Sequence, residues 1–178
     1  MKETVMRLLK KMTPGGTGPS ASDGRSRATT NVVYREIRHG ELSFVLRLGH
    51  EYFAELGMPV DYYDQKQLEQ QWTILSAVYP TALFTAWEGE QCLGGMGVCL
   101  FREEYSPLIF VGEIFLFVRP MHRGRGIEDQ LIRMAEIWGH ALGAKEMRLG
   151  RFSHTPGLGM YYESKGYKLF RCVHRKEL

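Results

Sequence analysis

The chain has 178 residues, of which 44% are hydrophobic and 24% are charged. That length and composition are typical of one soluble globular domain with its own core, and they exclude a disulfide-stapled miniprotein or a disordered chain. The net charge of +3 is unevenly spread, because residues 1–27 hold six basic and two acidic residues whereas the remainder holds 17 basic and 18 acidic ones. The near-neutral body argues against a protein that binds nucleic acid over its whole surface.

The three cysteines, Cys92, Cys99 and Cys172, form neither a CxxC pair nor a Cys/His cluster. An odd, scattered set of cysteines indicates reduced thiols rather than a disulfide framework or a metal site. No apolar run is long enough to span a bilayer, and no secretory signal is recognisable. We therefore expect a cytoplasmic protein with no metal and no membrane attachment.

The N-terminal residues 1–30 differ from the rest of the chain in composition. Residues 1–12 have the apolar spacing of a short amphipathic helix, and residues 13–30 are mainly Gly, Pro, Ser and Thr, as in linkers. We predict a basic arm or linker at 1–30 followed by one domain at 31–178. The arm is either a solvated terminus or a segment that docks on a partner, an acidic surface or nucleic acid through residues 1–27.

Hydrophobic periodicity, interrupted by glycine and proline, divides the domain into strands and helices in the order β-α-α-β-β-β-α-β-α-β. Gly57 is expected to cap the first helix at its C-terminus. Three glycines between residues 94 and 97 predict a bulge, or the close approach of another backbone, within a strand. The predicted strands are 32–38, 81–88, 91–101, 107–118, 144–150 and 167–175, and the predicted helices are 41–56, 64–79, 127–143 and 156–165.

The segment Gly112–Leu131 joins a buried strand, a basic turn and an amphipathic helix. Pro120 ends the strand, because proline cannot donate to a sheet ladder. The turn Arg123-Gly124-Arg125-Gly126 then presents two cations beside the first amides of a helix, an arrangement that binds phosphate. It lacks the Gly-Lys-Ser/Thr of a Walker A loop and the third glycine of a dinucleotide fingerprint. The alternative interpretation is a solvated basic turn.

Two motifs resemble those of the GCN5-related N-acetyltransferases, the GNAT superfamily. Motif A of that family reads Q/R-x-x-G-x-G/A, and Arg123, Gly126 and Glu128 stand at its first, fourth and sixth positions; the first two match and the third does not. Downstream, residues 161–167 (Tyr-Tyr-Glu-Ser-Lys-Gly-Tyr) are similar to the family's Leu-Tyr-Glu-x-x-Gly-Phe segment. The resemblance covers about residues 32–176.

The resemblance implies an α/β fold with a mixed central sheet of about six strands and helices on both faces. It also implies transfer of an acetyl group from acetyl-coenzyme A to a primary amine of a small molecule or protein; a homodimer is left open. The residues expected to hold the coenzyme are Phe117, Val118, Arg123, Gly124, Arg125, Gly126, Ile127, Glu128 and Asp129.

Two residues are expected to move protons. Glu113, on the central strand, stands near the place where the family often carries a glutamate base, although a solvated or arginine-paired glutamate is an equal alternative. Tyr162 matches the family tyrosine that protonates the leaving thiolate, and a phenol suits that donation. Tyr161 is then a packing residue. His122 is a weaker candidate base, because it adjoins the turn at 123–126 and is expected to contact phosphate or water.

The two helices at 41–56 and 64–79 roof the acceptor site in the family. The second is expected to bury Leu68, Trp72, Leu75 and Val78. Around the joining loop the chain carries four acids and two tyrosines, a set that suits a cationic amine flanked by aromatic rings or that forms a solvated helix face. These residues are Glu51, Glu55, Asp61, Asp64, Tyr62 and Tyr63.

Glu128 is the main departure from the family pattern. A carboxylate about 6 Å from a phosphate would cost roughly 3 kcal/mol at an effective dielectric of 20, unless Arg125 or Arg133 neutralises it or its side chain points outward. The family's asparagine upstream of the tyrosine is also missing, with Thr155 near that place. Two alternatives therefore stand beside the enzyme: a non-catalytic binding or structural protein that docks through its arm, and a nucleic-acid-modifying enzyme that uses the arm with Arg151, Arg171 and Arg175.

Overall fold

The computed structural model describes residues 31–38, 40–150 and 156–170. The chain divides into two compact units, Met1–Arg148 and Leu149–Leu178, which we describe separately. The arm at 1–30 lies outside the described residues, and so do Arg151, Thr155, Arg171, Cys172 and Arg175.

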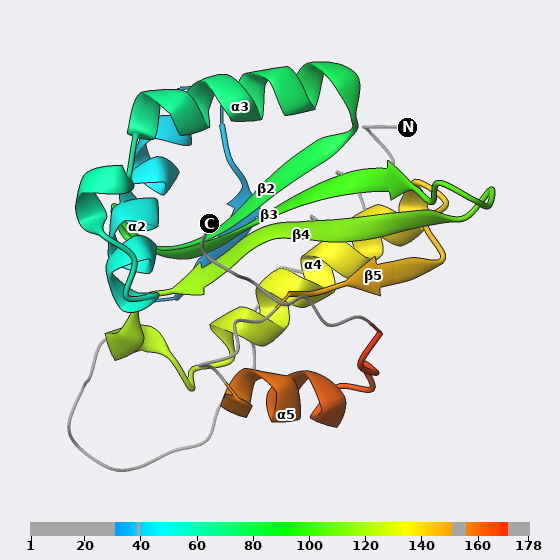
Figure 1. Ribbon diagram of the computed structural model, residues 1–178. Helices are drawn as coiled ribbons and strands as arrows, with labels where there is room; N and C mark the ends of the chain where they lie inside the picture. Colours follow the sequence, from blue (N-terminus) through cyan, green and yellow to red (C-terminus); the bar gives the residue numbers. More distant parts are fainter. Residues whose placement is uncertain (1–30, 39, 151–155, 171–178) are drawn as a thin grey trace, which may run out of the picture. The chain divides into compact units, whose positions relative to one another are not determined.

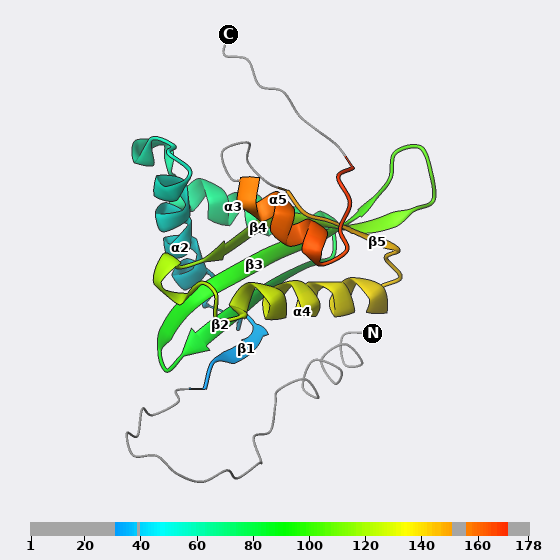
Figure 2. The same ribbon diagram turned by 90° about the horizontal axis from the view of Figure 1, so that it is seen from below.

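The first unit is built on a mixed sheet of five strands in the order β1-β2-β3-β4-β5 (Figure 2). Neighbouring strands are antiparallel except for β4 and β5, which are parallel. Their bounds are Val33–Glu36 for β1, Thr81–Glu88 for β2, Gln91–Arg102 for β3, Ile109–Val118 for β4 and Glu146–Arg148 for β5. The predicted α/β fold with a mixed central sheet is confirmed.

Helices cover both faces of this sheet (Figure 1). On one face lie α2 (Leu42–Glu55) and α3 (Gln65–Val78), joined through the 3-10 turn η1 (Val60–Tyr62). The other face packs against α4 (Ile127–Ala141), which contacts β2, β3 and β4. None of the helices in the described part of the chain is long and apolar enough to cross a bilayer.

Local chemistry sets the helix ends as the sequence predicts. Gly57 adopts φ 67°, the left-handed conformation that ends α2. The Asp64 carboxylate accepts hydrogen bonds from the amides of Lys66 and Gln67 at 2.9 and 3.0 Å, capping α3.

The predicted buried face of α3 is only partly formed. Leu68, Trp72 and Leu75 are half-buried rather than buried. Val78 is wrong as a core residue, because it is 66% exposed. The physical reason is that α3 packs chiefly against α2.

The last predicted strand is not observed where it can be checked. Residues 167–170 of the predicted strand 167–175 are described and adopt no strand, and residues 171–175 lie outside the described residues. The described sheet therefore has five strands rather than about six. The strand predicted at 144–150 is shorter, Glu146–Arg148, because its pairing with β4 runs only from Phe110 opposite Glu146 to Gly112 opposite Arg148.

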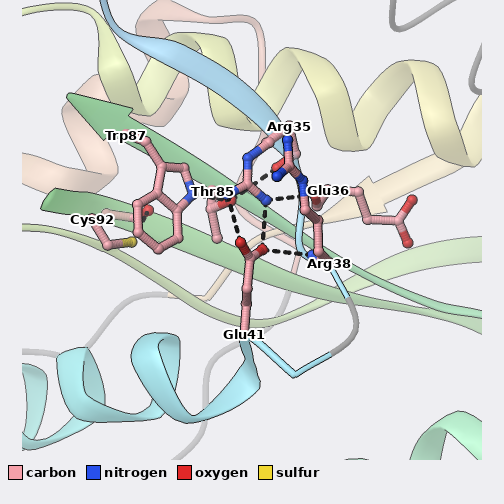
Figure 3. Close-up of polar contacts among 8 residues, drawn as sticks. Arg35, Glu36, Arg38, Glu41, Thr85, Trp87 and Cys92 are labelled. Atoms are coloured by element: carbon pink, nitrogen blue, oxygen red, sulfur yellow. Dashed lines mark hydrogen bonds and ion pairs between the residues drawn. The ribbon is translucent and has the colours of Figure 1, made fainter. Parts of the chain in front are cut away.

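A polar network fastens β1 to the start of α2 (Figure 3). The Arg35 guanidinium donates to both oxygens of Glu41 at 2.5 and 2.8 Å, and the Arg38 amide donates to the same carboxylate at 2.7 Å. These donors lower the pKa of Glu41 to about 2. The buried Thr85 of β2 donates to the Arg35 carbonyl at 3.0 Å and accepts from Trp87 Nε1 at 2.8 Å. The edge strand is thus held to the sheet by side chains as well as by its ladder.

In the second unit, α5 (Pro156–Ser164) is followed by Gly166 at φ 88°. The ring of Tyr162 lies between those of Tyr161 and Tyr167, with centroids 5.7 and 5.9 Å away. This helix and its glycine stop match the predicted helix 156–165.

Glycine allows β3 to approach the C-terminal end of β4. A methyl group at Gly94 would lie 2.6 Å from the Phe117 carbonyl oxygen and 2.9 Å from Val118 Cγ2. At Gly97 it would lie 2.7 Å from the Phe115 ring. The glycines between residues 94 and 97 therefore mark a close approach between β3 and β4, as predicted.

We expect Gly94→Ala to lower the free energy of unfolding by about 1–3 kcal/mol, because the new methyl group meets backbone atoms of β4 that cannot rotate away. Urea unfolding followed by circular dichroism measures the change. Gly157→Ala is the control, since nothing lies within 4 Å of its added methyl group and alanine favours a helix. A Gly94→Ala protein as stable as the Gly157→Ala protein would contradict the close approach.

Candidate active site

A tight turn connects β4 to α4. After Val118 the chain forms the 3-10 turn η2 (Pro120–His122), with the His122 amide bonded to the Arg119 carbonyl at 2.8 Å. Gly124 and Gly126 then adopt φ 71° and 76°, left-handed values that residues with a Cβ rarely take. The sequence folds this way locally because proline ends the strand and the two glycines permit the reversal into the helix.

No side chain of its N-cap residue covers the N-terminus of α4. Gly126 is its N-cap and supplies no side chain, and a methyl group at Gly124 or Gly126 would meet nothing within 4 Å. The Gln130 amide bonds to the Gly126 carbonyl at 3.2 Å, so the first helical amides, those of Ile127, Glu128 and Asp129, precede the regular hydrogen-bond ladder. Such amides, with the positive end of the helix dipole, bind anions.

Each of the two turn arginines already has an acidic partner. Arg123 Nη2 lies 2.5 Å from Glu55 Oε2, and Arg123 Nε donates to the Val118 carbonyl at 2.9 Å. Arg125 Nη2 lies 2.8 Å from Glu88 Oε1 at the end of β2. All four of these charged side chains are partly exposed, from 20% to 40%, so the pairs are accessible to an incoming anion.

A third pair ties the same turn to α2. Arg119 donates to both oxygens of Glu51 at 2.6–3.1 Å. Glu51 and Glu55 stand one helical turn apart and hold Arg119 and Arg123 respectively. The carboxylates of these two acids, which the sequence suggested for an amine site or a solvated helix face, are paired with arginines in and beside the turn.

His122 is buried, with 9% of its surface exposed. Its Nδ1 lies 2.8 Å from Arg125 Nη1, so Nδ1 accepts and the proton resides on Nε2. Nε2 has no hydrogen-bond partner among the described residues. The imidazole thus positions Arg125, and nothing in its surroundings favours the base role considered from sequence.

Glu128 is half-buried in the first turn of α4. Its charge and that of Arg125 both act on the phenol of Tyr34 in β1, whose pKa is raised chiefly by burial. No ion pair joins Glu128 to Arg125 or Arg133 in the described part of the chain, and Arg125 binds Glu88 instead. The ion pair with Arg125 or Arg133 that could neutralise Glu128 is therefore not formed in the described part of the chain.

The central strand carries a bulge at Ile114. Gly97 pairs with Phe115 and the next residue, Val98, pairs with Glu113, so Ile114 is the extra residue of β4. Pairing between β4 and β5 ends at Gly112 and Arg148. From Ile114 to Val118, the described strands pair with β4 on the β3 side only.

Glu113 lies at this bulge and is half-buried. Its charge acts on Tyr52 of α2, whose pKa is raised to about 12, first by burial and then by Glu113 and Glu55. Sequence reasoning missed Tyr52. The signal that it offered was an aromatic residue one position after Glu51, on a helix face that also carries Leu48.

An apolar cavity of about 240 Å³, which we call the α2–α3 cavity, lies between these two helices and β4. Ile114, Phe115 and Phe117 form its floor, and α2 and α3 form its walls. Tyr63 closes one side: its hydroxyl donates to the Leu46 carbonyl, and its ring occupies the space that a methyl group on Gly49 would need. The full lining is Val45, Leu46, Leu48, Gly49, Tyr52, Phe53, Tyr63, Leu68, Gln71, Trp72, Leu75, Ile114, Phe115 and Phe117.

The cysteines that the structure describes are poor nucleophiles. Burial raises the pKa of both Cys92 and Cys99 to about 11, so each stays a thiol near neutral pH. Neither is disulfide-bonded, and no cluster of metal-ligating side chains occurs among the described residues.

Tyr162, in the second unit, is buried with 6% of its surface exposed. Its role and that of Glu113 stay predictions. The residues expected to hold the coenzyme do share one place in the first unit, since Phe117 and Val118 end β4 and Arg123–Asp129 form the turn and first helical residues.

Comparison with known proteins points to one family. A family model described as an acetyltransferase (GNAT) domain matches residues 80–169. No curated protein sequence matches the chain.

Solved structures share the fold at low identity, with each match covering 83% of this chain. A GCN5-related N-acetyltransferase from Ralstonia eutropha JMP134 has a TM-score of 0.69 at 20% identity over 99% of its own length. The aminoglycoside acetyltransferase AAC(6')-Iy, in complex with a CoA-containing bisubstrate analog, has 0.66 at 21% over 99%. An aminoglycoside acetyltransferase from an uncultured soil metagenomic sample has 0.65 at 17% over 95%.

Proposed function

The chain belongs to the GNAT acetyltransferases, and from this premise we propose that it transfers an acetyl group from acetyl-coenzyme A to a primary amine by direct attack of the amine on the thioester. The observation that carries the proposal is the α4 N-terminus, which has no side-chain cap at Gly126 and has open space at the Cβ positions of Gly124 and Gly126. A diphosphate fits that place, because the helical amides offer donors and the nearby arginines offer charge.

Beyond the turn, the edge of β4 opposite β3 suits an extended ligand. Residues 114–118 have no strand on that side in the described chain, so their backbone groups can bind the amide-containing arm of coenzyme A as another strand would. This edge leads from the turn at Val118 back to the bulge at Ile114. The thioester end of the arm would then lie near Glu113.

We assign the proton transfers as the sequence suggests. Glu113, half-buried beside Tyr52, accepts the proton of the ammonium, directly or through water. Tyr162 donates a proton to the leaving thiolate. Direct attack is supported further by the raised pKa values of Cys92 and Cys99, which disfavour an acyl-cysteine route through either residue.

One alternative has an observation in its favour. A non-catalytic GNAT-fold binding protein would need no phosphate site, and here Glu128 stands in the first turn of α4 while Arg123 and Arg125 are both paired to glutamates. Titration with acetyl-coenzyme A separates the two functions: the enzyme binds it, and the binding protein does not.

Arg123→Ala should weaken acetyl-coenzyme A binding by about 1–3 kcal/mol, as for a lost hydrogen bond between charged groups. Isothermal titration calorimetry measures the dissociation constant. Arg133→Ala is the matched control, because Arg133 is an exposed cation two turns further along α4 and its loss changes the net charge equally. Equal affinities of the two variants would argue against a phosphate contact at Arg123.

Glu128→Gln should tighten acetyl-coenzyme A binding, by up to about a hundredfold if the full repulsion of roughly 3 kcal/mol is relieved. The same titration applies, with Glu136→Gln, two turns along α4, as the control that removes an equal charge away from the turn. An unchanged or weaker affinity for Glu128→Gln would mean that this carboxylate faces away from the ligand.

Tyr162→Phe should lower kcat by roughly 10²–10⁴-fold, as for loss of a general acid, and should leave the affinity for acetyl-coenzyme A unchanged. Release of free thiol during turnover measures kcat, and calorimetry measures affinity. The neighbouring Tyr161→Phe keeps both values. If Tyr162→Phe turns over at the wild-type rate, its hydroxyl has a structural role.

A further inference from the structure

The walls of the α2–α3 cavity are aromatic and aliphatic, with few polar atoms. Six of its lining residues carry rings, namely Tyr52, Phe53, Tyr63, Trp72, Phe115 and Phe117. Of the polar groups, the Tyr63 hydroxyl is already bonded to the Leu46 carbonyl, and Gln71 is largely exposed. Among the described residues, no carboxylate lines the cavity, so this lining offers no partner for a ligand with several charges.

Most of the acidic side chains around the cavity already have a hydrogen-bond or ion-pair partner. Glu51 and Glu55 bind Arg119 and Arg123 of the phosphate turn, and Asp64 caps α3. A polycationic ligand such as an aminosugar needs several exposed acceptors. These three carboxylates are not arranged to supply them.

Tyr52 is a lining residue of the cavity with carboxylates within electrostatic reach. Both Glu113 and Glu55 act on its phenol, and Glu55 is itself paired with Arg123. Ile114, the neighbour of Glu113, also lines the cavity. One ammonium group beside Glu113 and the Tyr52 ring is therefore the charge that this site accommodates, while the remaining wall favours an apolar body.

The size of the cavity fits a small body of this kind. Its volume is about 240 Å³, whereas roughly 150 Å³ suffices for one benzene molecule in an apolar protein interior. A single ring therefore leaves room in the cavity for a short aliphatic chain attached to it. Flat aromatic walls from both helices and from β4 would contact both faces of such a ring.

We propose that the α2–α3 cavity holds the apolar body of the acceptor, and that the acceptors of this enzyme are monoamines bearing an aromatic or branched aliphatic group rather than polycationic amines. The proposal rests on the acetyltransferase function proposed above. It places the reactive amine beside Glu113 and the bulge, and it differs from the aminoglycoside chemistry of the enzymes with similar folds.

Adjacent residues on α3 provide a matched pair of variants. Leu75 lines the cavity, whereas Ile74 is 66% exposed on the outer face of the same helix. Phenethylamine and spermidine are titrated separately into the full chain without coenzyme, and binding is followed by ligand-observed NMR. We expect phenethylamine to bind at least tenfold more tightly than spermidine, to lose at least tenfold in Leu75→Trp, and to be unaffected in Ile74→Trp.

A second variant guards against misfolding of Leu75→Trp. Leu75→Ala enlarges the cavity and should shift the preference from phenethylamine towards the larger 2-(1-naphthyl)ethylamine. Equal phenethylamine affinity in wild type and a folded Leu75→Trp, an unchanged preference in Leu75→Ala, or tighter binding of spermidine would each overturn the proposal. Acetyl-coenzyme A binding is measured in parallel and should be the same in all of these proteins. If wild type does not bind acetyl-coenzyme A, the proposed acetyltransfer function is overturned. The amine titrations still test the cavity in that case, because they contain no coenzyme.

Discussion

The feature on which the site depends is that β4 is paired on both sides only as far as Gly112. Up to that residue the strand is a central member of the sheet, and beyond it one edge is left without a strand partner in the described chain. Backbone groups along the edge of a strand form hydrogen bonds with another strand, a ligand or solvent. The bulge at Ile114 lies two residues after Gly112, where pairing between β4 and β5 ends, and it changes which side chains of β4 face α2 and α3.

Three charged pairs then link the phosphate turn to elements that are distant in sequence. Arg119 and Arg123 are held by Glu51 and Glu55 of α2, and Arg125 is held by Glu88 of β2. Exposed pairs of this kind contribute only about 0–1 kcal/mol each, whereas hydrogen bonds between charged groups and a ligand contribute about 1.5–3 kcal/mol. The arginines can therefore exchange a carboxylate for a phosphate at a small cost.

Sequence reasoning located the turn because its signals are local. Proline after the strand, two glycines that need positive φ and an amphipathic helix leave few conformations open, and the glycines of β3 likewise report a backbone contact. It could not locate the α2–α3 cavity, whose floor and walls come from residues up to about 70 positions apart. Nor could it assign Glu51 and Glu55, since acids on a helix look the same whether they face solvent or an arginine 68 residues away. The strand predicted at 167–175 is not formed over its described residues, 167–170, because aromatic residues and leucine favour a strand only where a neighbouring strand pairs with them.

The exchange of partners at the turn has a consequence for the amine. Glu55 is bound to Arg123 in the structure, and its charge also reaches Tyr52 in the lining of the cavity. In the proposed enzyme, a phosphate that bound Arg123 would leave the Glu55 carboxylate without this counter-ion, and an unpaired charge is less screened than a paired one. An ammonium group near Tyr52 would then be bound more tightly, and by reciprocity the amine would favour the phosphate-bound turn. Under the proposed function, Glu55 would thus couple binding of the coenzyme to binding of the acceptor.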